Sequence, residues 1–256
     1  MRILSWNVNG LRALYKKGLF WESLHDWDPD VICLQETKST LEQLPLEISQ
    51  MPDYNSHFFW PEFKKGYSGV AVYSKSLPLS VQNGIGNSAM DNEGRVIVAD
   101  YGEFLLANVY FPNGRSSPER LDYKMRFYDA FLGYISNLKS SGRRVIFCGD
   151  VNTAHKPIDL ARPKANEHTS GFLEQERAWI DKLELGGFVD IFRDFNKNPE
   201  QYTYWDTISR ARERNVGWRI DYFFVDEELK PHVKNCFILP QIFGSDHCPI
   251  VLDIDL

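Results

Sequence analysis

Nine short runs of apolar, β-branched and aromatic residues recur along the chain, and each predicts a strand. In order they read RILSWNV, VICLQ, SHFFW, GVAVYSK, RVIVADY, FLLANVYF, RRVIFCG, IDYFFV and PIVLDID. Runs such as VIFC contain no polar position, which is typical of strands that are buried on both faces. The pattern therefore predicts a protein with extensive β-sheet.

Between the strand runs, apolar residues recur every three or four positions, as on one face of a helix. The clearest example spans residues 117–142, where Ser117 is a typical N-cap and Gly142 a typical stop. Its predicted apolar face consists of Leu121, Met125, Tyr128, Leu132 and Ile135. Two more helices are predicted over 173–185 and within 12–27. Strands alternating with helices indicate an α/β sandwich, in which two sheets pack together and helices cover the outer faces.

The length of 256 residues allows one large domain or two small ones. No low-complexity tract, flexible linker or repeat of about 20 to 50 residues marks a boundary, so we expect one domain over 1–256. No run of about 18 apolar residues is present that could cross a membrane. The opening MRILSWNVNG lacks the basic and apolar regions of a signal peptide. We therefore expect a soluble, cytoplasmic protein, with a monomer as the default state.

Composition and charge narrow the chemistry further. The cysteines stand far apart, without CxxC spacing, and are expected to be buried thiols rather than disulfides or zinc ligands. They are Cys33, Cys148, Cys236 and Cys248. A net charge of −6 argues against a protein that coats nucleic acid through long-range attraction, since such binding needs many basic residues. It does not exclude a local basic rim around an acidic, cation-binding centre.

Polar side chains follow several of the predicted buried strands at the point where each strand ends. They are Asn7 and Asn9 after ILSW, Glu36 after VICLQ, Tyr110 and Asn113 around NVYFP, and Asp150 and Asn152 after VIFCG. α/β proteins build sites at such strand ends, because the sheet holds the side chains rigidly. Any one of these motifs alone is more often a turn or a helix cap. Together with the SDH motif at 245–247 they favour a functional site.

The chemical types of these residues indicate a hard metal ion. The set consists mainly of carboxylate and amide oxygens, with one histidine: Asn7, Glu36, Asp150, Asn152, Asp246 and His247. Oxygen ligands suit Mg²⁺ or Mn²⁺, whereas Zn²⁺ favours several histidines and cysteines. Gathered carboxylates repel one another, and a divalent ion relieves that cost. Cys248, next to His247, is expected to pack as a small apolar residue.

Seven motifs together resemble a known family. SWNVNGLRA, LQETK, KKGYSGVAVYSK, NVYFPNG, CGDVNTAH, NVGWRIDYFFV and GSDHCPI are similar, in this order and over nearly the whole chain, to the exonuclease III-like apurinic/apyrimidinic (AP) endonucleases. These belong to the endonuclease/exonuclease/phosphatase superfamily. GDxN and SDH alone specify only the superfamily, whereas WNVNGLRA, GYSG and NVGWRIDY indicate its DNA-repair branch. The resemblance implies a four-layered α/β sandwich, two mixed sheets flanked by helices, with the site at one end.

The resemblance also implies a reaction and a substrate. The family hydrolyses the phosphodiester 5′ to an abasic site in duplex DNA, with Mg²⁺ as cofactor and Mn²⁺ as a possible substitute. A 3′→5′ exonuclease and a 3′-phosphatase or phosphodiesterase activity often accompany it. The partner would be double-stranded DNA that carries an abasic site or a blocked 3′ end.

Roles for the matching residues follow from the same resemblance. Glu36 would be the main metal ligand, Asp150 would deprotonate the attacking water, and His247 would contact the scissile phosphate. Asp221 of WRIDY would hold the ring of His247. The implied catalytic groups are Tyr110, Asp150, Asn152, Asp221 and His247, and the implied metal-site residues are Asn7, Glu36, Asp150, Asn152, Asp246 and His247.

Substrate contacts are implied as well. Tyr204, Trp218 and Ile220 would wall a small apolar pocket for the flipped deoxyribose, which a nucleotide with its base cannot enter. Ile208 lies where relatives insert a side chain into the helix. Further DNA contacts are implied for Arg12, Lys16, Lys17, Tyr67, Ser68, Gly69, Asn113 and Asn166. Gly69 is read equally well as a simple turn or as a close backbone approach to phosphate.

Two positions depart from the family pattern, and two other functions stay open. Asn9 stands where some relatives carry Asp, so no second metal position is assigned. Arg115 is spaced differently from their intercalating Arg and receives no role. One alternative is another phosphoesterase of the superfamily, acting on inositol phosphates or sphingomyelin or as a nonspecific nuclease. The other is a DNA-binding module without catalysis, which the complete set of acidic and histidine residues disfavours.

Overall fold

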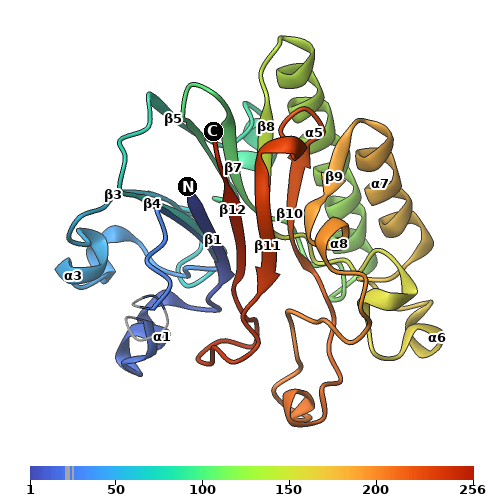
Figure 1. Cartoon of the computed structure of the whole chain (residues 1–256). Helices are drawn as coiled ribbons and strands as arrows, with labels where there is room; N and C mark the ends of the chain where they lie inside the picture. Colours follow the sequence, from blue (N-terminus) through green and yellow to red (C-terminus); the bar gives the residue numbers. More distant parts are fainter. Residues whose placement is uncertain (21–23, 25) are drawn as a thin grey trace.

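The computed structural model describes residues 1–20, 24 and 26–256, which form two mixed, six-stranded sheets packed face to face (Figure 1). The first sheet has the order β11-β12-β1-β2-β4-β3 and the second the order β5-β6-β7-β8-β10-β9. The first comprises β1 (Arg2–Asn7), β2 (Val31–Gln35), β3 (Asn55–Phe59), β4 (Val70–Ser74), β11 (Val233–Ile238) and β12 (Ile250–Ile254). The second comprises β5 (Ser80–Asn83), β6 (Val96–Asp100), β7 (Leu105–Tyr110), β8 (Val145–Asp150), β9 (Phe188–Asp190) and β10 (Asp221–Asp226).

The helices among the described residues are α1 (Leu11–Lys16), α3 (Leu46–Ser49), α4 (Ser88–Asp91), α5 (Pro118–Ser140), α6 (Pro163–Asn166), α7 (Glu174–Leu185) and α8 (Ile191–Phe195), with short 3₁₀ turns at Leu41–Gln43, Pro157–Asp159, Ala211–Arg214 and Lys230–His232. The longer ones cover the outer faces of the sheets, whereas α8 packs against β10 and β11, one strand from each sheet. In Figure 1, α5 and α7 lie against the second sheet and α1 and α3 against the first. The four-layered α/β sandwich expected from the resemblance is confirmed.

Each sheet contains one parallel pair, and this pairing decides where the polar strand ends meet. β1 runs parallel to β2 and β7 runs parallel to β8, whereas their other partners are antiparallel. A parallel pair needs a crossover connection, and α5 supplies it between β7 and β8. The carboxyl ends of all four strands therefore lie at one end of the sandwich, away from the two chain termini (Figure 1).

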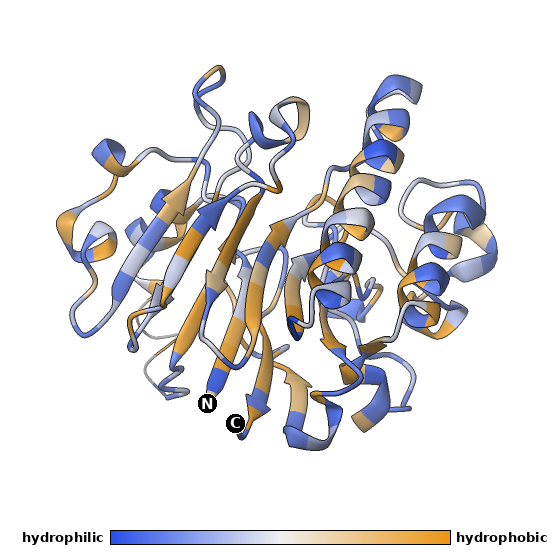
Figure 2. Cartoon of the chain, turned by 90° about the horizontal axis from the view of Figure 1, so that it is seen from above, coloured by the Kyte–Doolittle hydropathy of each residue, from blue (hydrophilic) through white to orange (hydrophobic). Residues whose placement is uncertain are grey.

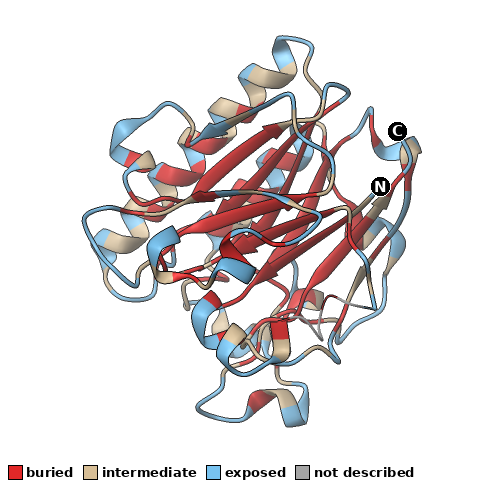
Figure 3. Cartoon of the chain, turned by 90° about the vertical axis from the view of Figure 1, so that its left-hand side faces the viewer, coloured by how far each residue is buried: buried red, intermediate tan, exposed pale blue. Residues whose placement is uncertain are grey.

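Three apolar clusters hold the layers together. The first lies between the sheets and contains Ile3, Cys33, Leu106 and Phe223, each almost fully buried. The second packs the outer face of the second sheet against α5 and α7, and the third packs the first sheet against α1 and α3. Figure 2 shows apolar residues concentrated in the strands, and Figure 3 shows the strands buried over most of their length.

All nine predicted strands are present as β1, β2, β3, β4, β6, β7, β8, β10 and β12. β5, β9 and β11 were not predicted, and all three lie at sheet edges. β5 reads SVQN and has no buried residue, and β9 is three residues long, so neither carries the signal of a buried strand. All four cysteines are buried free thiols, as predicted.

Two of the predicted helices lie where they were expected, but the buried face of one and the length of the third prediction differ. α5 begins after the Ser117 cap, whose hydroxyl accepts a hydrogen bond from the Arg120 amide, and α7 covers the second predicted helix. The fully buried face of α5 is Lys124, Phe127, Tyr128, Phe131 and Ile135, one position away from much of the predicted stripe. The third prediction, over 12–27, matches α1 only to Lys16, and residues 21–23 and 25 lie outside the described residues.

The described residues contain no helix that combines the length and the apolar character needed to cross a membrane.

Candidate active site

Four strand ends from the two sheets bring a cluster of polar side chains together. Asn7 ends β1, Glu36 follows β2, Tyr110 ends β7 and Asp150 ends β8. The Nδ2 of Asn7 donates to Oε1 of Glu36 at 3.1 Å and to Oδ2 of Asp150 at 2.9 Å. Asn7 thus links the first sheet to the second, and the predicted convergence of these residues is confirmed.

The orientation of Asn7 differs from the oxygen ligand that the resemblance implied. Its Oδ1 accepts a hydrogen bond of 3.0 Å from the backbone amide of Asn9, which turns Nδ2 toward the two carboxylates. An amide nitrogen cannot bind a cation. In this arrangement Asn7 therefore bridges Glu36 and Asp150 as a donor.

Asp150 is the most perturbed acid of the cluster. The residue is 1 % exposed, and its carboxylate accepts hydrogen bonds from the backbone amide and the Nδ2 of Asn152, at 2.8 and 3.1 Å. Burial raises the pKa of Asp150 to about 7; Asp221 and Glu36 add to the increase, whereas His247 opposes it. A carboxylate with a pKa near neutrality is suited to accept a proton from water.

His247 and Asp221 form a buried pair beside Asp150. Nδ1 of His247 lies 2.8 Å from Oδ2 of Asp221, and Nε2 lies 3.9 Å from Oδ2 of Asp150. Burial acts to lower the pKa of His247, but Asp221 outweighs this effect, with further help from Asp150 and Asp246, and raises the pKa to about 10. The ring is therefore an imidazolium at neutral pH, and the predicted contact with Asp221 is confirmed.

Asn152 occupies a strained backbone position at the centre of the cluster. Its φ of +57° is in the left-handed region, which few residues other than glycine and asparagine adopt. Its Nδ2 donates to the Phe111 carbonyl at 3.0 Å, and its Oδ1 accepts from Nδ2 of Asn113 at 2.9 Å. These bonds fix the amide in one orientation and place the exposed Asn113 beside it.

Glu36 is also held in the left-handed region, with a φ of +53°. Burial acts to raise the pKa of Glu36, but the nearby ammonium of Lys38 and hydrogen bonds from Lys38, Tyr110 and Asn7 outweigh it and lower the pKa. The Nζ of Lys38 lies 2.8 Å from Oε2 of Glu36. Glu36 is therefore an ionised acceptor. Tyr110 itself is almost buried, and that burial raises the pKa of its hydroxyl well above the usual range, so it acts as a donor.

Asp246 lies on the opposite rim and faces the same cavity. Its Oδ1 accepts hydrogen bonds from Nδ2 of Asn9 at 2.9 Å and from Oγ of Ser245 at 3.1 Å. Lys38 also donates to Oδ1 of Asn9. Asn9 therefore connects Lys38 to Asp246 in a chain of hydrogen bonds above the cluster. Cys248, two residues further on, is buried among apolar side chains, as predicted.

A cavity of about 130 Å³ lies over this cluster and has one apolar wall. Its lining includes Glu36, Asn113, Arg115, Asp150, Asn152, Gly171, Tyr204, Trp218, Ile220, Asp246 and His247. Tyr204 and Trp218 lie side by side because their backbones exchange two hydrogen bonds, of 2.8 and 2.9 Å. The ring of Tyr204 is 4.9 Å from that of His247, so the apolar wall adjoins the polar cluster.

Arg115, which received no role from the sequence, is part of this cavity. Its guanidinium lies over the Trp218 ring, 5.0 Å from the centroid, and its Nε donates to the Ser170 carbonyl at 3.1 Å. Gly171 lies beside both Arg115 and Trp218. Its φ is +101°, and a Cβ at this position would lie 3.4 Å from the Trp218 ring.

The residues implied in DNA binding lie around the same end of the molecule. Arg12, Lys16 and Lys17 are exposed on or next to α1, and Nζ of Lys17 donates to the Gly244 carbonyl at 3.2 Å. Ile208 is 93 % exposed, on the loop that follows Tyr204 and Trp205. Asn166, at the end of α6, is partly exposed.

The GYSG loop pairs with the segment that follows Glu36, and this pairing buries Ser68, which was expected to contact DNA. The amide of Thr37 donates to the Gly69 carbonyl, and the amide of Lys38 donates to the Ser68 carbonyl, at 3.0 and 2.9 Å. Ser68 is only 1 % exposed because the loop packs against this segment, so its side chain is not available to DNA. Tyr67 is half-buried, and its hydroxyl donates to Glu93 and accepts from Arg95 and Arg120.

The cluster has the donor set that a hard cation requires. One oxygen or nitrogen atom from each of Asp150, Asp221 and His247 lies within 4.8 Å of the others. Oδ1 of Asp221 is buried without a hydrogen-bond partner. Crowded, partly unpaired carboxylates are costly unless a cation or a proton neutralises them. Glu36 and Asp246 line the same cavity as Asp150 and His247, and the carboxylates of this cavity fit a divalent ion that prefers oxygen ligands.

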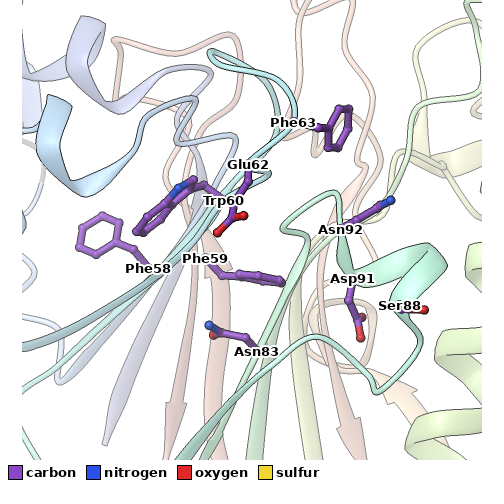
Figure 4. Close-up of a pocket in the computed structure, with 9 residues that line it drawn as sticks. All are labelled: Phe58, Phe59, Trp60, Glu62, Phe63, Asn83, Ser88, Asp91 and Asn92. Atoms are coloured by element: carbon purple, nitrogen blue, oxygen red, sulfur yellow. The ribbon is translucent and has the colours of Figure 1, made fainter.

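Two other candidate sites are less suited to chemistry. His155, Asp181 and Glu184 also lie close together, but Nζ of Lys156 pairs with Asp181 at 2.6 Å and supplies the positive charge. A cavity of about 690 Å³ lies between β3, β5 and α4 (Figure 4), lined by Phe58, Phe59, Trp60, Glu62, Phe63, Asn83, Ser88, Asp91 and Asn92. The Asp91 carboxylate there already accepts the amides of Ile85 and Asn87, and no predicted site residue lines this cavity.

Two further charged residues lie behind the cavity, and no sequence motif pointed to them. Lys124 and Glu176 are fully buried and pair at 2.6 Å. One signal was available: Lys124 falls on the apolar stripe of its helix, four positions before Tyr128. A charged residue at such a position needs a buried partner.

Comparisons with known proteins agree with this geometry. Residues 4–247 match the sequence profile of the Endonuclease/Exonuclease/phosphatase family. The chain is 46 % identical to an exodeoxyribonuclease of Bacillus subtilis over 100 % of both chains. It is 44 % identical to the DNA repair nuclease APEX1 of Danio rerio, over 98 % of this chain and 81 % of that protein.

Solved structures give the same picture. An AP endonuclease from Archaeoglobus fulgidus superimposes with a TM-score of 0.89 at 29 % identity, over 100 % of both chains. The 3′ phosphatase NExo from Neisseria, bound to a product DNA hairpin, superimposes with a TM-score of 0.90 at 27 % identity, again over 100 % of both chains.

Proposed function

The chain belongs to the endonuclease/exonuclease/phosphatase family, and on this premise we propose that it is a Mg²⁺-dependent DNA-repair nuclease that hydrolyses the phosphodiester 5′ to an abasic site. One observation carries the proposal. A perturbed acid, Asp150, a charged histidine, His247, and an apolar wall containing Trp218 line one cavity of about 130 Å³. The exodeoxyribonuclease and DNA-repair relatives support a nucleic acid substrate.

Asp150 is the base in this mechanism. Water is a poor nucleophile at neutral pH, and a phosphodiester repels anions, so the attacking water must lose its proton as it reaches phosphorus. Asp150 accepts hydrogen bonds from Asn7 and Asn152, which fix its orientation. Its carboxylate takes the proton and directs the oxygen of the water toward the phosphate.

Donors on the other side of the cavity stabilise the charge that develops on the phosphate. Nδ1 of His247 is occupied by Asp221, so the Nε2–H of the imidazolium is the free donor and points into the cavity. Tyr110 contributes a further donor for the phosphoryl or leaving oxygen. Asn152, whose Nδ2 already donates to Phe111 and Asp150, steadies the base instead. Because these groups are already fixed before substrate arrives, little reorganisation is needed in the transition state.

Glu36 would be the main ligand of a metal ion, with Asp150 and Asp246 close to the same space. Mg²⁺, or Mn²⁺ in its place, would supply positive charge that offsets the charge of the phosphate and of the leaving oxygen. The lowered pKa of Glu36 keeps this ligand ionised over the physiological range. In the arrangement described, Asn7 holds Glu36 and Asp150 in place rather than binding the ion itself.

The apolar wall selects the substrate. Tyr204, Trp218 and Ile220 line the cavity of about 130 Å³. In the proposed function this wall accepts a flipped deoxyribose and excludes an attached base. Flipping also costs least where no base is paired. Intact DNA is therefore disfavoured both by the cost of flipping and by the exclusion of its base from the pocket. Arg115, stacked on Trp218, lines the same cavity and is placed to contact the phosphate next to the sugar.

Exposed groups around the cavity grip the DNA backbone. Residues on three sides of the centre contact phosphates of the two strands. They are Arg12, Lys16 and Lys17 on the α1 side, Tyr67 and Gly69 in the GYSG loop, and Asn113 and Asn166 near the pocket. Ile208 enters the helix beside the lesion. The same centre, reached by a 3′ end, supports 3′→5′ exonuclease and 3′-phosphatase or phosphodiesterase activity.

The protein acts as a monomer in the cytoplasm. All four cysteines are buried free thiols, which agrees with a reducing compartment. The catalytic groups named above come from one chain, so a second copy is not needed to complete the centre.

The test is cleavage of an end-labelled duplex with one abasic site. Incubation with Mg²⁺ should give a single nick 5′ to the lesion, followed by trimming of the 3′ end, and EDTA should abolish both. An Asp150→Asn variant is the matched control. Efficient hydrolysis of an inositol phosphate or sphingomyelin, with intact abasic duplex, would instead favour another phosphoesterase. Mg²⁺-independent binding without cleavage would indicate a DNA-binding module.

A further inference from the structure

A fully buried ion pair joins two helices directly behind the cavity. Nζ of Lys124, on α5, lies 2.6 Å from Oε1 of Glu176, on α7, and both side chains are 0 % exposed. Neither residue lines the cavity. Buried ion pairs are weak contributors to stability, because the cost of removing both charges from water offsets their attraction. Their presence here therefore calls for another explanation.

Lys124 binds the backbone of the segment that carries the catalytic residues. Its Nζ donates to the carbonyl oxygen of Asn152 and to Oγ1 of Thr153, both at 2.8 Å. Because Asn152 has a φ of +57°, its carbonyl points toward α5 and its side chain stays beside Asp150. The ammonium thus compensates for a strained conformation that the side chain of Asn152 needs.

Glu176 binds the segment that carries the back of the pocket. Its Oε2 accepts the amides of Gly171 at 2.6 Å and Leu173 at 3.0 Å, and its Oε1 accepts the hydroxyl of Ser170 at 2.9 Å. Gly171 reaches the cavity between Asn152 and Trp218: a Cβ there would lie 3.3 Å from the Asn152 carbonyl and 3.4 Å from the Trp218 ring. A small shift of this segment would therefore change the pocket.

The two segments are thus joined by this pair of charges and by one backbone hydrogen bond. Lys124 holds Asn152, Glu176 holds Gly171, and Ala154 closes the arrangement by donating its amide to the Gly171 carbonyl at 2.8 Å. The bond between Nζ and Oε1 fixes the spacing of the two segments. Lys124 also lies close enough to Asp150 and Arg115 for both to influence its pKa.

We propose that Lys124 and Glu176 are positioning residues that set the distance between the catalytic amide of Asn152 and the pocket wall at Gly171. The proposal rests on the proposed function and extends it: one buried pair couples hydrolysis to recognition of the abasic sugar. Neither residue contacts the substrate. Removing the pair should alter both turnover and selectivity, whereas a merely structural pair would alter stability alone.

Three variants and one control separate these roles. Lys124→Met and Glu176→Gln each break the pair, and the double variant Lys124→Met with Glu176→Leu replaces it by apolar side chains. The double variant leaves no unpaired buried charge, but it also removes the acceptor of the Gly171 and Leu173 amides. The control is Lys139→Met, on the same helix, which breaks the pair of Lys139 with Asp226, at 2.8 Å and remote from the cavity. Thermal unfolding of each variant shows that it is folded.

Kinetics on the abasic duplex give the first readout. We expect kcat to fall by about 10²-fold in the double variant, since a misplacement of about 1 Å has an effect of this size. The ratio of kcat/KM for abasic over undamaged duplex should fall by about tenfold, and Lys139→Met should keep both values within about threefold. A folded double variant with unchanged kcat and unchanged selectivity would overturn the proposal.

Hydrogen exchange gives a second readout that does not depend on activity. In the DNA-free protein, the amides of Gly171, Leu173 and Ala154 should exchange at least tenfold faster in the double variant, while amides of β8 and β10 keep their rates. Lys139→Met should leave all of them unchanged. If the unmodified protein fails to cleave abasic DNA, the proposed function is wrong, but the exchange rates still test the positioning role of Lys124 and Glu176. Unchanged exchange at Gly171 and Leu173 in the double variant would refute that role.

Discussion

Oδ2 of Asp221 lies 2.8 Å from Nδ1 of His247, although 26 residues separate them in the chain. Asp221 begins β10, in the second sheet, and His247 precedes β12, in the first. The contact therefore joins the two sheets at the end where the cavity lies. It fixes the ring so that Nε2 faces Asp150, and it keeps the imidazole charged.

Asp221→Asn should reduce kcat by about 10²- to 10³-fold, the size of effect seen when one fixed donor to a developing charge is lost. The amide removes the negative charge that favours imidazolium, so a smaller fraction of His247 is charged at neutral pH. Asp226→Asn, on the same strand and remote from the cavity, is the control. Single-turnover cleavage of the abasic duplex measures both, and equal rates for Asp221→Asn and the control would contradict the role.

Asp150→Asn should abolish cleavage and stabilise the metal-free protein at pH 8. The folded-state pKa of Asp150 is raised from 3.8 to about 7, so its contribution to stability is complete below about pH 4 and is lost as pH rises through 7. An asparagine does not ionise and avoids that loss. Thermal unfolding in EDTA at pH 8 should show a Tm a few degrees higher for the variant; a lower Tm would mean that the buried carboxylate is well compensated.

Added Mg²⁺ should raise the Tm of the unmodified protein at pH 8, because a cation that binds only the folded state stabilises it. The gain should be largely absent in Glu36→Gln, which removes the main proposed ligand. A titration followed by thermal unfolding gives the comparison without substrate. Equal gains in the two proteins would place the metal ion elsewhere.

Trp218→Ala should weaken discrimination between abasic and undamaged duplex by at least tenfold, since the apolar wall that excludes a base is opened. Trp60→Ala is the matched control, because Trp60 lines the separate cavity between β3 and β5. The measured quantity is the ratio of kcat/KM values for the two duplexes. An unchanged ratio would remove Trp218 from the pocket for the sugar.

Gly69→Ala should lower both stability and activity, whereas Gly66→Ala should lower stability by the backbone strain alone. Both glycines have positive φ, +89° and +71°, but a Cβ at Gly69 would overlap Oγ1 of Thr37, while a Cβ at Gly66 meets nothing within 4 Å. Backbone strain alone costs roughly 1 to 2 kcal/mol. Urea unfolding measures the loss in free energy of unfolding for each variant, and a larger loss for Gly69→Ala would report the close packing that supports Glu36. Equal losses in the two variants would favour a simple turn at Gly69.

Regular patterns made much of the fold predictable. The nine buried strands and α5 carry apolar residues at the spacing that their secondary structure requires. The missed strands β5, β9 and β11 lie at sheet edges, where side chains need not be apolar, and their pairing depends on neighbours that are distant in the chain. The predicted buried face of α5 differs from the observed one, which includes Lys124, a charged residue that an apolar pattern does not identify.

For the site, local motifs indicated the residues but not their orientation. Glu36, Asp150, Asn152 and His247 were identified as members of one cluster, and the structure brings them together. Asn7 faces the carboxylates with its nitrogen because the Asn9 backbone occupies its oxygen, and the direction of one amide leaves no trace in the sequence. The burial of Ser68 likewise results from its pairing with a segment 30 residues away.

The sequence by itself determined the class of fold, the oxygen-rich chemistry of the centre and the family, because these follow from periodicity, from residue types at strand ends and from motifs. The tertiary structure alone decided contacts that no motif implied. The stacking of Arg115 on Trp218 and the buried contact of Lys124 with Glu176 both join segments far apart in the chain. Such contacts depend on how two sheets and their helices pack, and no local pattern encodes that packing.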